Sequence, residues 1–246
     1  MSPVVEATTQ ESRPAAIAAA ADAVRAGQVV VFPTDTVYGV GCDAFNAVAV
    51  KAMLAAKGRG PEMPPPVLIH DVATLDGLAA DVAPYVRDLV EHFWPGPLTV
   101  IVAAQPSLQW DLGETRGTVA LRVPDDPIAR ALLKEIGPMA VTSANRTGQA
   151  AATTVLDAAT QLGALISVYV DGGPRGVRPA STIIDCTGAV PVLVRAGAIS
   201  AAALADFLPA QTQSVDGPAD ELAEGGDDPS AEHLADELAK GADDKS

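Results

Sequence analysis

The chain has 246 residues, of which 48% are hydrophobic and 4% aromatic, and its formal net charge at pH 7 is −15. A folded unit of about 200 residues buries roughly 70% of the surface that its unfolded chain exposes, so a core can form here without disulfides or metals. The acidic balance argues against broad, sequence-independent nucleic-acid binding, which needs a basic surface, although it leaves room for a small cationic pocket.

The cysteines and histidines are too few and too scattered to form a structural framework. Cys42 and Cys186 form no Cys-x-x-Cys pattern and are interpreted as free thiols in a reducing cytosol. The two Cys and three His show no zinc-ligand spacing. The N-terminus has no charged segment leading into an apolar core, and no run of about 18 or more apolar residues occurs. We therefore expect a cytoplasmic protein with neither a signal peptide nor a membrane span.

The chain opens with a polar segment, an Ala-rich helix and a buried strand. Residues 1–13 are polar and expected to be loose, and residues 14–25 have high helix propensity, with Gly27 as the expected stop. Residues 29–32 are apolar, mostly β-branched and too few for a buried helix, which predicts a strand. Pro33 cannot donate to a ladder, so regular pairing is expected to end there.

The segment after this strand is unusually polar for a loop. It holds three hydroxyl groups and a carboxylate, which belong to Thr34, Thr36, Tyr38 and Asp35. Gly39 and Gly41 then permit either close backbone approach or a positive φ. In sheets flanked by helices, ligands bind beyond strand ends, so these side chains are placed to meet one. The alternative is a turn whose Thr and Asp side chains bond their own backbone.

The rest of the chain mixes helices and strands without strict alternation. Helices are predicted at residues 44–57, 74–78, 84–93, 127–136, 154–162 and 201–207, and strands at 67–69, 98–103, 118–123, 140–142, 167–171, 182–185 and 190–195. This order predicts one α/β domain (mixed α+β), residues 14–208, with a twisted, largely mixed sheet flanked by helices. Residues 209–246 form an acidic tail too poor in apolar residues to fold alone, and we expect it to be disordered apart from a transient helix at 231–240.

Binding of an anionic ligand must rely on scattered basic residues. No Gly-x-x-x-x-Gly-Lys-Ser/Thr or Gly-x-Gly-x-x-Gly motif follows a predicted strand. Lys57 and Arg59 end a predicted helix, where they either complement its dipole or reach a ligand. Arg122 lies inside an apolar strand and Arg195 ends another. A buried arginine has to be paired or face a cavity, because an unpaired buried charge is too costly.

An ordered series of motifs identifies the chain with a known family. The series comprises Phe32-Pro33-Thr34-Asp35-Thr36-Val37-Tyr38-Gly39-Val40-Gly41-Cys42-Asp43-Ala44, Lys57-Gly58-Arg59, Phe93-Trp94-Pro95-Gly96-Pro97-Leu98-Thr99, Thr118-Val119-Ala120-Leu121-Arg122-Val123-Pro124, Thr142-Ser143-Ala144-Asn145-Arg146-Thr147-Gly148, Asp171-Gly172-Gly173-Pro174, Ser181-Thr182-Ile183-Ile184-Asp185 and Val194-Arg195-Ala196-Gly197. Together these motifs resemble the YrdC/Sua5 family, the threonylcarbamoyl-AMP synthases of tRNA modification. The resemblance spans residues 14–208 and implies a single YrdC-like domain around a large concave site.

The resemblance also implies an activity and roles for individual residues. The reaction it implies joins L-threonine, bicarbonate and ATP, with Mg²⁺ on the phosphates, into threonylcarbamoyl-AMP and pyrophosphate. The product would pass to a threonylcarbamoyl transferase complex acting on tRNA, to make N6-threonylcarbamoyladenosine. By similarity, threonine and bicarbonate are bound by Thr34, Thr36, Tyr38, Arg122 and Ser181. By similarity, ATP is bound by Lys57, Arg59, Thr118, Ser143, Asn145 and Arg195, of which Lys57 and Arg59 are also the candidate catalytic residues. No protein side chain is assigned to a metal.

Some of these residues have plainer interpretations. Ser143 and Asn145 follow a short strand, where such residues also cap turns. The chain departs from the family pattern in three places. Gly60-Pro61 replaces the single Pro of Lys-Gly-Arg-Pro, with Met63 and Pro64-Pro65-Pro66 after it. Ala151 stands where a Ser is common, and Ala180 where a Glu often precedes the Ser-Thr pair. The first departure puts a nucleotide contact of that loop in question.

Two other functions compete with this interpretation. Hydrogenase maturation factors carry a similar domain that makes a carbamoyl-adenylate, but they are much longer and contain zinc-finger-like and acylphosphatase segments. A non-catalytic RNA-binding or ribosome-associated module is the other alternative, which the acidic balance disfavours.

Overall fold

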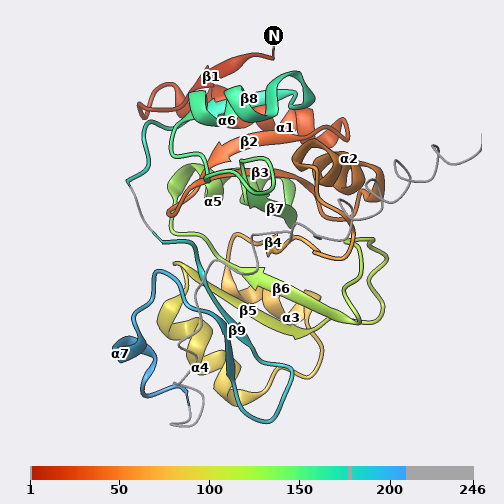
Figure 1. Ribbon diagram of the computed structural model, residues 1–246, viewed down its shortest axis with the longest axis vertical. Coiled ribbons are helices and arrows are strands. Elements are labelled where there is room, and N and C mark those ends of the chain that lie inside the picture. Colours follow the sequence, from red (N-terminus) through yellow and green to blue (C-terminus); the bar gives the residue numbers. More distant parts are fainter. Residues whose placement is uncertain (1, 177–178, 209–246) are drawn as a thin grey trace, which may run out of the picture.

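Ten strands form one mixed sheet along the long axis of the molecule in the computed structural model, which describes residues 2–176 and 179–208 (Figure 1). In space they lie in the order β1-β8-β2-β3-β7-β4-β6-β5-β9-β10. Their bounds are β1 Val4–Glu6, β2 Val30–Pro33, β3 Tyr38–Asp43, β4 Val67–Leu68, β5 Leu98–Ala103, β6 Thr118–Arg122, β7 Met139–Ser143, β8 Val168–Asp171, β9 Thr182–Asp185 and β10 Val192–Arg195. Parallel pairs such as β2·β8 and β5·β9 occur beside antiparallel pairs such as β3·β7. The predicted mixed α/β fold is confirmed.

Helices flank this sheet along its whole length. Their bounds are α1 Arg13–Arg25, α2 Ala47–Lys57, α3 Leu75–Leu78, α4 Pro84–Phe93, α5 Pro127–Ile136, α6 Val155–Leu162 and α7 Ala201–Leu204, with 3-10 turns at Val72–Thr74 and Gly163–Leu165. In Figure 1, α1, α2, α5 and α6 surround the end of the sheet that contains β1, whereas α3, α4 and α7 lie at the end that contains β9. Within the described residues, no helix is long and apolar enough to cross a membrane.

Local capping explains where several helices begin and end. The Asn46 side chain accepts a hydrogen bond from the Ala49 amide at the start of α2, and Gly58 ends that helix with φ +67°. At α5, Asp126 accepts hydrogen bonds from the amides of Ile128 and Ala129. Such caps satisfy backbone groups that a helix terminus leaves without partners. The sequence predicted these helices because the signals are local.

The two faces of the sheet belong to separate hydrophobic clusters, because side chains alternate along each strand. Helices α1 and α5 pack against one another and over β8 and β2, where Ala20, Leu132 and Phe32 are buried together. Helices α2, α4 and α6 contribute to the cluster on the opposite face, with side chains such as Met53 and Leu89. Buried apolar contact on both faces therefore stabilises the sheet.

One stretch of the α1/α5 face remains open beyond β7. In β5, Leu98, Val100 and Val102 belong to the cluster that α4 joins. The alternating residues Thr99 and Ile101 consequently point to the other face, where they line a cavity. The alternation of the strand therefore places a polar side chain on the open face.

Three expectations about the N-terminal region were wrong. Residues 4–6, expected to be loose, form β1, which pairs in parallel with β8. Residues 38–43, expected to be a loop, form the central strand β3, which pairs with β2 and β7. Pro33 does not end the pairing either, since it lies opposite Tyr38. The polar loop is thus a tight connection within a hairpin.

The two glycines of β3 are explained by close packing. Neither Gly39 nor Gly41 has a positive φ. A Cβ at Gly39 would lie 2.8 Å from a Val141 methyl group, and one at Gly41 would lie 2.9 Å from the other methyl of Val141. Of the two reasons that the sequence left open, close approach is therefore the one observed.

Two further expectations concern the C-terminal part. The last helix is shorter than predicted, since α7 ends at Leu204. The predicted acidic tail, residues 209–246, and its transient helix lie outside the described residues.

Candidate active site

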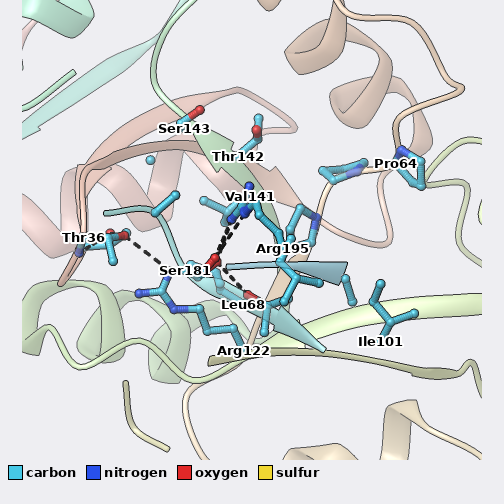
Figure 2. A pocket seen from close by; sticks show the side chains of 18 of the residues that line it. Thr36, Pro64, Leu68, Ile101, Arg122, Val141, Thr142, Ser143, Ser181 and Arg195 are labelled. Atoms are coloured by element: carbon cyan, nitrogen blue, oxygen red, sulfur yellow. Dashed lines mark hydrogen bonds between the residues drawn. The ribbon is translucent and has the colours of Figure 1, made fainter. Parts of the chain in front are cut away.

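A cavity of about 350 Å³ occupies the open part of the sheet face (Figure 2). Its walls come from segments far apart in the sequence, namely residues 34–39, 64–66, 118–122, 141–143 and 180–183, together with Arg59 and Arg195. One wall is largely apolar and is formed by Pro64, Pro65, Pro66, Leu112 and Ile101. A concave, partly apolar site with a few convergent polar groups is typical of small-ligand binding.

Most of the site residues predicted from the sequence come together here. The lining includes Thr34, Thr36, Tyr38, Arg59, Thr118, Arg122, Ser143, Ser181 and Arg195. Lys57 and Asn145 are absent from it. The structure thus brings nine of the predicted residues around one cavity and places the other two behind its wall.

Arg122 is buried and held in place on several sides. Its Nη2 donates to Asp35 Oδ1 at 2.6 Å, in an ion pair whose two side chains are 8% and 7% exposed. Its Nε donates to the Gly96 carbonyl at 3.0 Å, and its Nη1 approaches Thr36 Oγ1 at 3.4 Å. A guanidinium has more N–H donors than these bonds use, so a ligand in the cavity can take the remainder.

Arg195 is tied to the segment that carries Ser181. Its Nε and Nη2 donate to the Ser181 carbonyl at 3.2 and 2.8 Å, and Nη2 also reaches Ser181 Oγ at 3.1 Å. Figure 2 shows these bonds as dashed lines inside the cavity. Burial, and then the charge of Arg122, lower the pKa of Arg195. The guanidinium groups of Arg122 and Arg195 thus lie close enough to repel each other.

Arg59 adds a third guanidinium to the same cavity. Its Nη1 donates to Thr142 Oγ1 at 3.2 Å, whereas its buried Nε has no hydrogen-bond partner in the described structure. Burial lowers the pKa of Arg59, Glu62 raises it, and Arg195 lowers it further. None of the lining residues that the structure describes is an Asp or Glu. Asp35 offsets the charge of Arg122 through their ion pair, whereas no ion pair to Arg59 or Arg195 is found among the described residues. The cavity therefore keeps a net positive charge, which an anionic ligand would relieve.

Lys57 is buried, with an exposed fraction of 4%, and its ammonium contacts the loop after β7. Its Nζ donates to the Ser143 carbonyl, to the Asn145 carbonyl at 2.6 Å and to Asn145 Oδ1 at 3.3 Å. The Lys57 carbonyl in turn accepts from the Thr147 amide at 2.9 Å. Burial, and then Arg59, lower the pKa of Lys57 to about 7. In this arrangement, Lys57 and Asn145 hold the end of β7, where Ser143 lines the cavity.

The hydroxyls of the β2–β3 hairpin are largely engaged within the protein. Thr34 Oγ1 donates to the Val37 carbonyl at 2.6 Å and lies 3.1 Å from Thr36 Oγ1. The Tyr38 hydroxyl donates to the Gly173 carbonyl at 2.8 Å, and burial raises its pKa to about 12. The self-bonding turn that the sequence left open therefore exists, and its residues also line the cavity.

Reasoning from the sequence missed several wall residues. Thr99 is 1% exposed, lines the cavity and donates to Ser181 Oγ at 3.0 Å. The signal was present, since Thr99 is a polar residue between the apolar Leu98 and Val100, but the same alternation marks any strand with one solvated face. The apolar wall from Pro64 to Pro66 was noted only as a departure from a pattern.

No protein metal site is evident in the described part of the chain, because no group of three or more His, Cys, Asp or Glu side chains could hold an ion. Mg²⁺ usually keeps several waters and binds through one or two carboxylates plus substrate phosphates. None of the described residues that line the cavity is an Asp or Glu, so the lining itself offers Mg²⁺ no carboxylate ligand.

Comparison with known proteins gives one consistent result. A family model for Sua5/YciO/YrdC, described as "Telomere recombination", matches residues 22–197. A Mycobacterium leprae (strain TN) protein, "Putative threonylcarbamoyl-AMP synthase", is 48% identical over 208 residues, which cover 85% of this chain and 94% of the relative. The threonylcarbamoyl-AMP synthase of Bacillus subtilis (strain 168) is 41% identical over 186 residues, 75% of this chain and 54% of that protein.

A solved structure supports the same relationship. The crystal structure of P. abyssi Sua5 complexed with L-threonine matches with a TM-score of 0.79 and 31% identity. The match covers 84% of this chain and 61% of that longer chain.

Proposed function

The chain belongs to the Sua5/YciO/YrdC family, and we propose that it is a threonylcarbamoyl-AMP synthase. In this proposal, L-threonine, bicarbonate and ATP are converted to threonylcarbamoyl-AMP and pyrophosphate. The enzyme is then a nucleotidyltransferase that acts in the cytoplasm. Its product goes to a transferase complex that modifies tRNA to N6-threonylcarbamoyladenosine.

The observation that carries the proposal is the charge of the cavity. Arg59, Arg122 and Arg195 converge on a space lined by hydroxyl groups, in a chain whose net charge is −15. Such a site suits the carboxylate and phosphate groups of an amino acid and a nucleotide. The relatives that match most of this chain are named for the same product.

The chemistry needs a carboxylate brought to the α-phosphate of ATP. The threonine amine forms a C–N bond with the carbon of bicarbonate, a C–O bond breaks and water leaves. The resulting N-carboxylate attacks that phosphorus, the bond from the phosphorus to the oxygen it shares with the β-phosphate breaks, and pyrophosphate leaves. Negative charge builds on the phosphate oxygens, and fixed cations stabilise it without reorganising. In this proposal, Arg59 and Arg195, which line the cavity, supply these cations, while Arg122, oriented by Asp35, holds the carboxylate of the amino acid.

Three parts of the protein position these groups. The Lys57 ammonium holds the end of β7 with Ser143. Ser181 immediately precedes β9, Arg195 ends β10, and the β2–β3 hairpin carries Thr36. Mg²⁺ enters with ATP, where it would neutralise phosphate charge. In this proposal, the apolar wall of residues 64–66 keeps water away from part of the bound substrates.

The test is pyrophosphate release from ATP in carbonate-depleted buffer, with threonine and bicarbonate added singly and together. We expect release only when both are present. 2-Aminobutyrate, which lacks the hydroxyl of threonine, should be a poor substitute, because a site built for a hydroxyl strongly rejects an analogue without it.

Equal release without bicarbonate, or with any amino acid in place of threonine, would refute the proposed reaction. Formation of the predicted product is checked by mass spectrometry of the acyl-adenylate. RNA binding by the intact protein whose affinity falls as salt rises would instead support a binding module.

A further inference from the structure

The Ser181 hydroxyl lies at the point where three elements meet inside the cavity. Ser181 immediately precedes β9, Thr99 belongs to β5, and Arg195 ends β10. Ser181 is 8% exposed and lines the cavity, so its hydroxyl faces whatever binds there. Figure 2 shows Ser181 and Arg195 together near the centre of the site.

The backbone around Ser181 is closely fixed. The Thr182 amide donates to the Pro97 carbonyl at 2.9 Å, and the Ala198 amide donates to the Ala180 carbonyl at 2.9 Å. A Cβ on Gly197 would lie 2.4 Å from the Ala180 carbonyl oxygen and 2.6 Å from the Ser181 carbonyl carbon. The segment therefore packs directly on the backbone of Gly197, and the Ser181 side chain starts from a fixed position.

A serine hydroxyl has one proton to donate and two lone pairs that accept. Thr99 Oγ1 donates to Ser181 Oγ at 3.0 Å, and Arg195 Nη2 donates to the same oxygen at 3.1 Å. An arginine can only donate, so the direction of the second bond is certain. Both lone pairs of Ser181 Oγ are then occupied. Within the described part of the chain, no acceptor for its proton is found.

We propose that Thr99 is a positioning residue for the reaction: together with Arg195 it occupies both lone pairs of the Ser181 hydroxyl, so that Ser181 can only donate, to an oxygen atom of the substrate. The group bound at this corner is therefore a hydrogen-bond acceptor, and the Arg195 guanidinium beside Ser181 Oγ favours an oxyanion, either the carboxylate of the amino acid or a phosphate of the nucleotide. An ammonium group is excluded from it, because Ser181 has no lone pair left to accept its hydrogens.

The Thr36 hydroxyl, in contrast to that of Ser181, presents an acceptor to the cavity. Thr34 Oγ1 already gives its proton to the Val37 carbonyl, so the bond between the two threonine hydroxyls must be donated by Thr36. Thr36 Oγ1 then offers lone pairs, one of which faces Arg122 Nη1 at 3.4 Å. The site thus has a donor at Ser181 and an acceptor at Thr36, which orients a ligand that carries both an anion and an N–H group.

This inference rests on the proposed function, and a double-mutant cycle tests it. Thr99→Val keeps the branched shape and removes the hydroxyl, and Thr99→Ser keeps the hydroxyl. Ser181→Ala removes the donor. A hydrogen bond to a charged group corresponds to roughly a tenfold effect, so we expect Thr99→Val to lower kcat/KM about tenfold and Thr99→Ser to stay within about threefold of the wild type.

The decisive variant is the double mutant Thr99→Val/Ser181→Ala. If Thr99 acts through Ser181, the double mutant is no slower than Ser181→Ala alone. Multiplied losses would show a separate structural role and overturn the inference, as would wild-type kinetics for Thr99→Val. If Thr99→Val fails to fold, as judged by thermal unfolding, Thr99→Ala replaces it in the same cycle.

Calorimetric binding of L-threonine and of ATP, measured separately, keeps this inference distinct from the proposed reaction. The ligand that Thr99→Val weakens identifies the oxyanion as the carboxylate or a phosphate, and either result supports the proposal. Unchanged binding of both ligands contradicts it, even if the wild type makes the product. A wild type that binds threonine but releases no pyrophosphate would refute the proposed function alone.

Discussion

The two halves of one sheet face differ in chemistry although their strands follow the same rule. Under α1 and α5, the side chains that point to this face are apolar, as Phe32 and Val170 show. Beyond β7, the corresponding positions are Thr99 in β5 and Arg122 in β6. Both are buried, with exposed fractions of 1% and 6%. Polar alternation here marks a binding cavity and not a solvated face.

The difference teaches how the fold divides its work. The covered half gains stability from apolar burial. The open half keeps polar groups in place with protein partners, such as Asp35 for Arg122 and Ser181 for Arg195. Substitutions in the covered half should therefore act on stability alone, whereas those in the open half should also lower activity.

The largest effect is expected from Arg122→Met in the open half. It removes a cavity cation and its ion pair with Asp35, and breaking a buried pair costs about 3–5 kcal/mol of stability. We expect kcat/KM to fall more than about 100-fold, because the bound carboxylate loses its cationic partner and Asp35 and Gly96 lose the side chain that they bond. Steady-state kinetics and urea unfolding measure the two effects.

The matched control is Arg130→Met, an exposed arginine on α5. It should stay within about twofold of the wild type in activity and within about 0.5 kcal/mol in stability. Similar losses in the two variants would show that the open half is not special.

Leu132→Ala and Ile101→Ala compare apolar residues of the two halves directly. Leu132 of α5 is 1% exposed in the covered half, so its truncation should cost about 2–5 kcal/mol of unfolding free energy. Activity per folded molecule should not change. Ile101 lies in the cavity wall, so Ile101→Ala should lower the free energy of unfolding by less than about 1.5 kcal/mol. It should nevertheless reduce kcat/KM roughly fivefold, because the ligand loses a surface that packs against it.

Denaturation curves and kinetics on the same preparations separate the two effects. The proposed difference between the two halves is contradicted if Leu132→Ala changes kcat/KM under conditions where the protein is fully folded. It is also contradicted if Ile101→Ala leaves kcat/KM unchanged.

Lys57 gives a pH-dependent test at the border between the halves. Its pKa is lowered to about 7 in the folded protein, from 10.5. Between pH 7 and 9 the unfolded chain keeps the lysine proton while the folded chain loses it. The unfolded state therefore binds more protons, and stability rises with pH, by up to about 2 kcal/mol across this window.

Lys57→Met lacks this titration, so its stability should fall behind that of the wild type as the pH rises from 7 to 9. Burial raises the pKa of Cys42 and Cys186 to about 12, so ionisation of these thiols in the unfolded chain lowers stability over the same pH range. This effect is the same in both proteins and cancels in the difference between their stability curves. Parallel stability curves for the two proteins, measured by urea unfolding at each pH, would show that Lys57 stays charged throughout.

The smallest effect is expected from removal of residues 210–246. We propose that this acidic segment makes no transition-state contact, since it is poor in apolar residues and its charge would repel ATP. Truncation after Pro209 should leave kcat/KM within about threefold of the wild type. A hundredfold loss in the pyrophosphate assay would assign the segment to the site.

Local patterns in the sequence were enough for most elements and for the composition of the site. Helix α5 could be predicted because Asp126, Pro127 and an apolar period act within a few residues of one another. The motifs also identified nine residues that line the cavity. These signals are short-range, so they can be read without knowing what the segment packs against.

Only the tertiary structure decided which strands pair and which partners each polar group takes. β1 is a strand because β8, more than a hundred residues later, offers it hydrogen bonds. β3 tolerates two glycines because Val141 packs against them. The direction of the hydrogen bonds at the Ser181 hydroxyl depends on Thr99, which donates to it from the neighbouring strand β5. A backbone or hydroxyl group is satisfied by whatever the fold brings within about 3 Å, and that neighbour is distant in sequence.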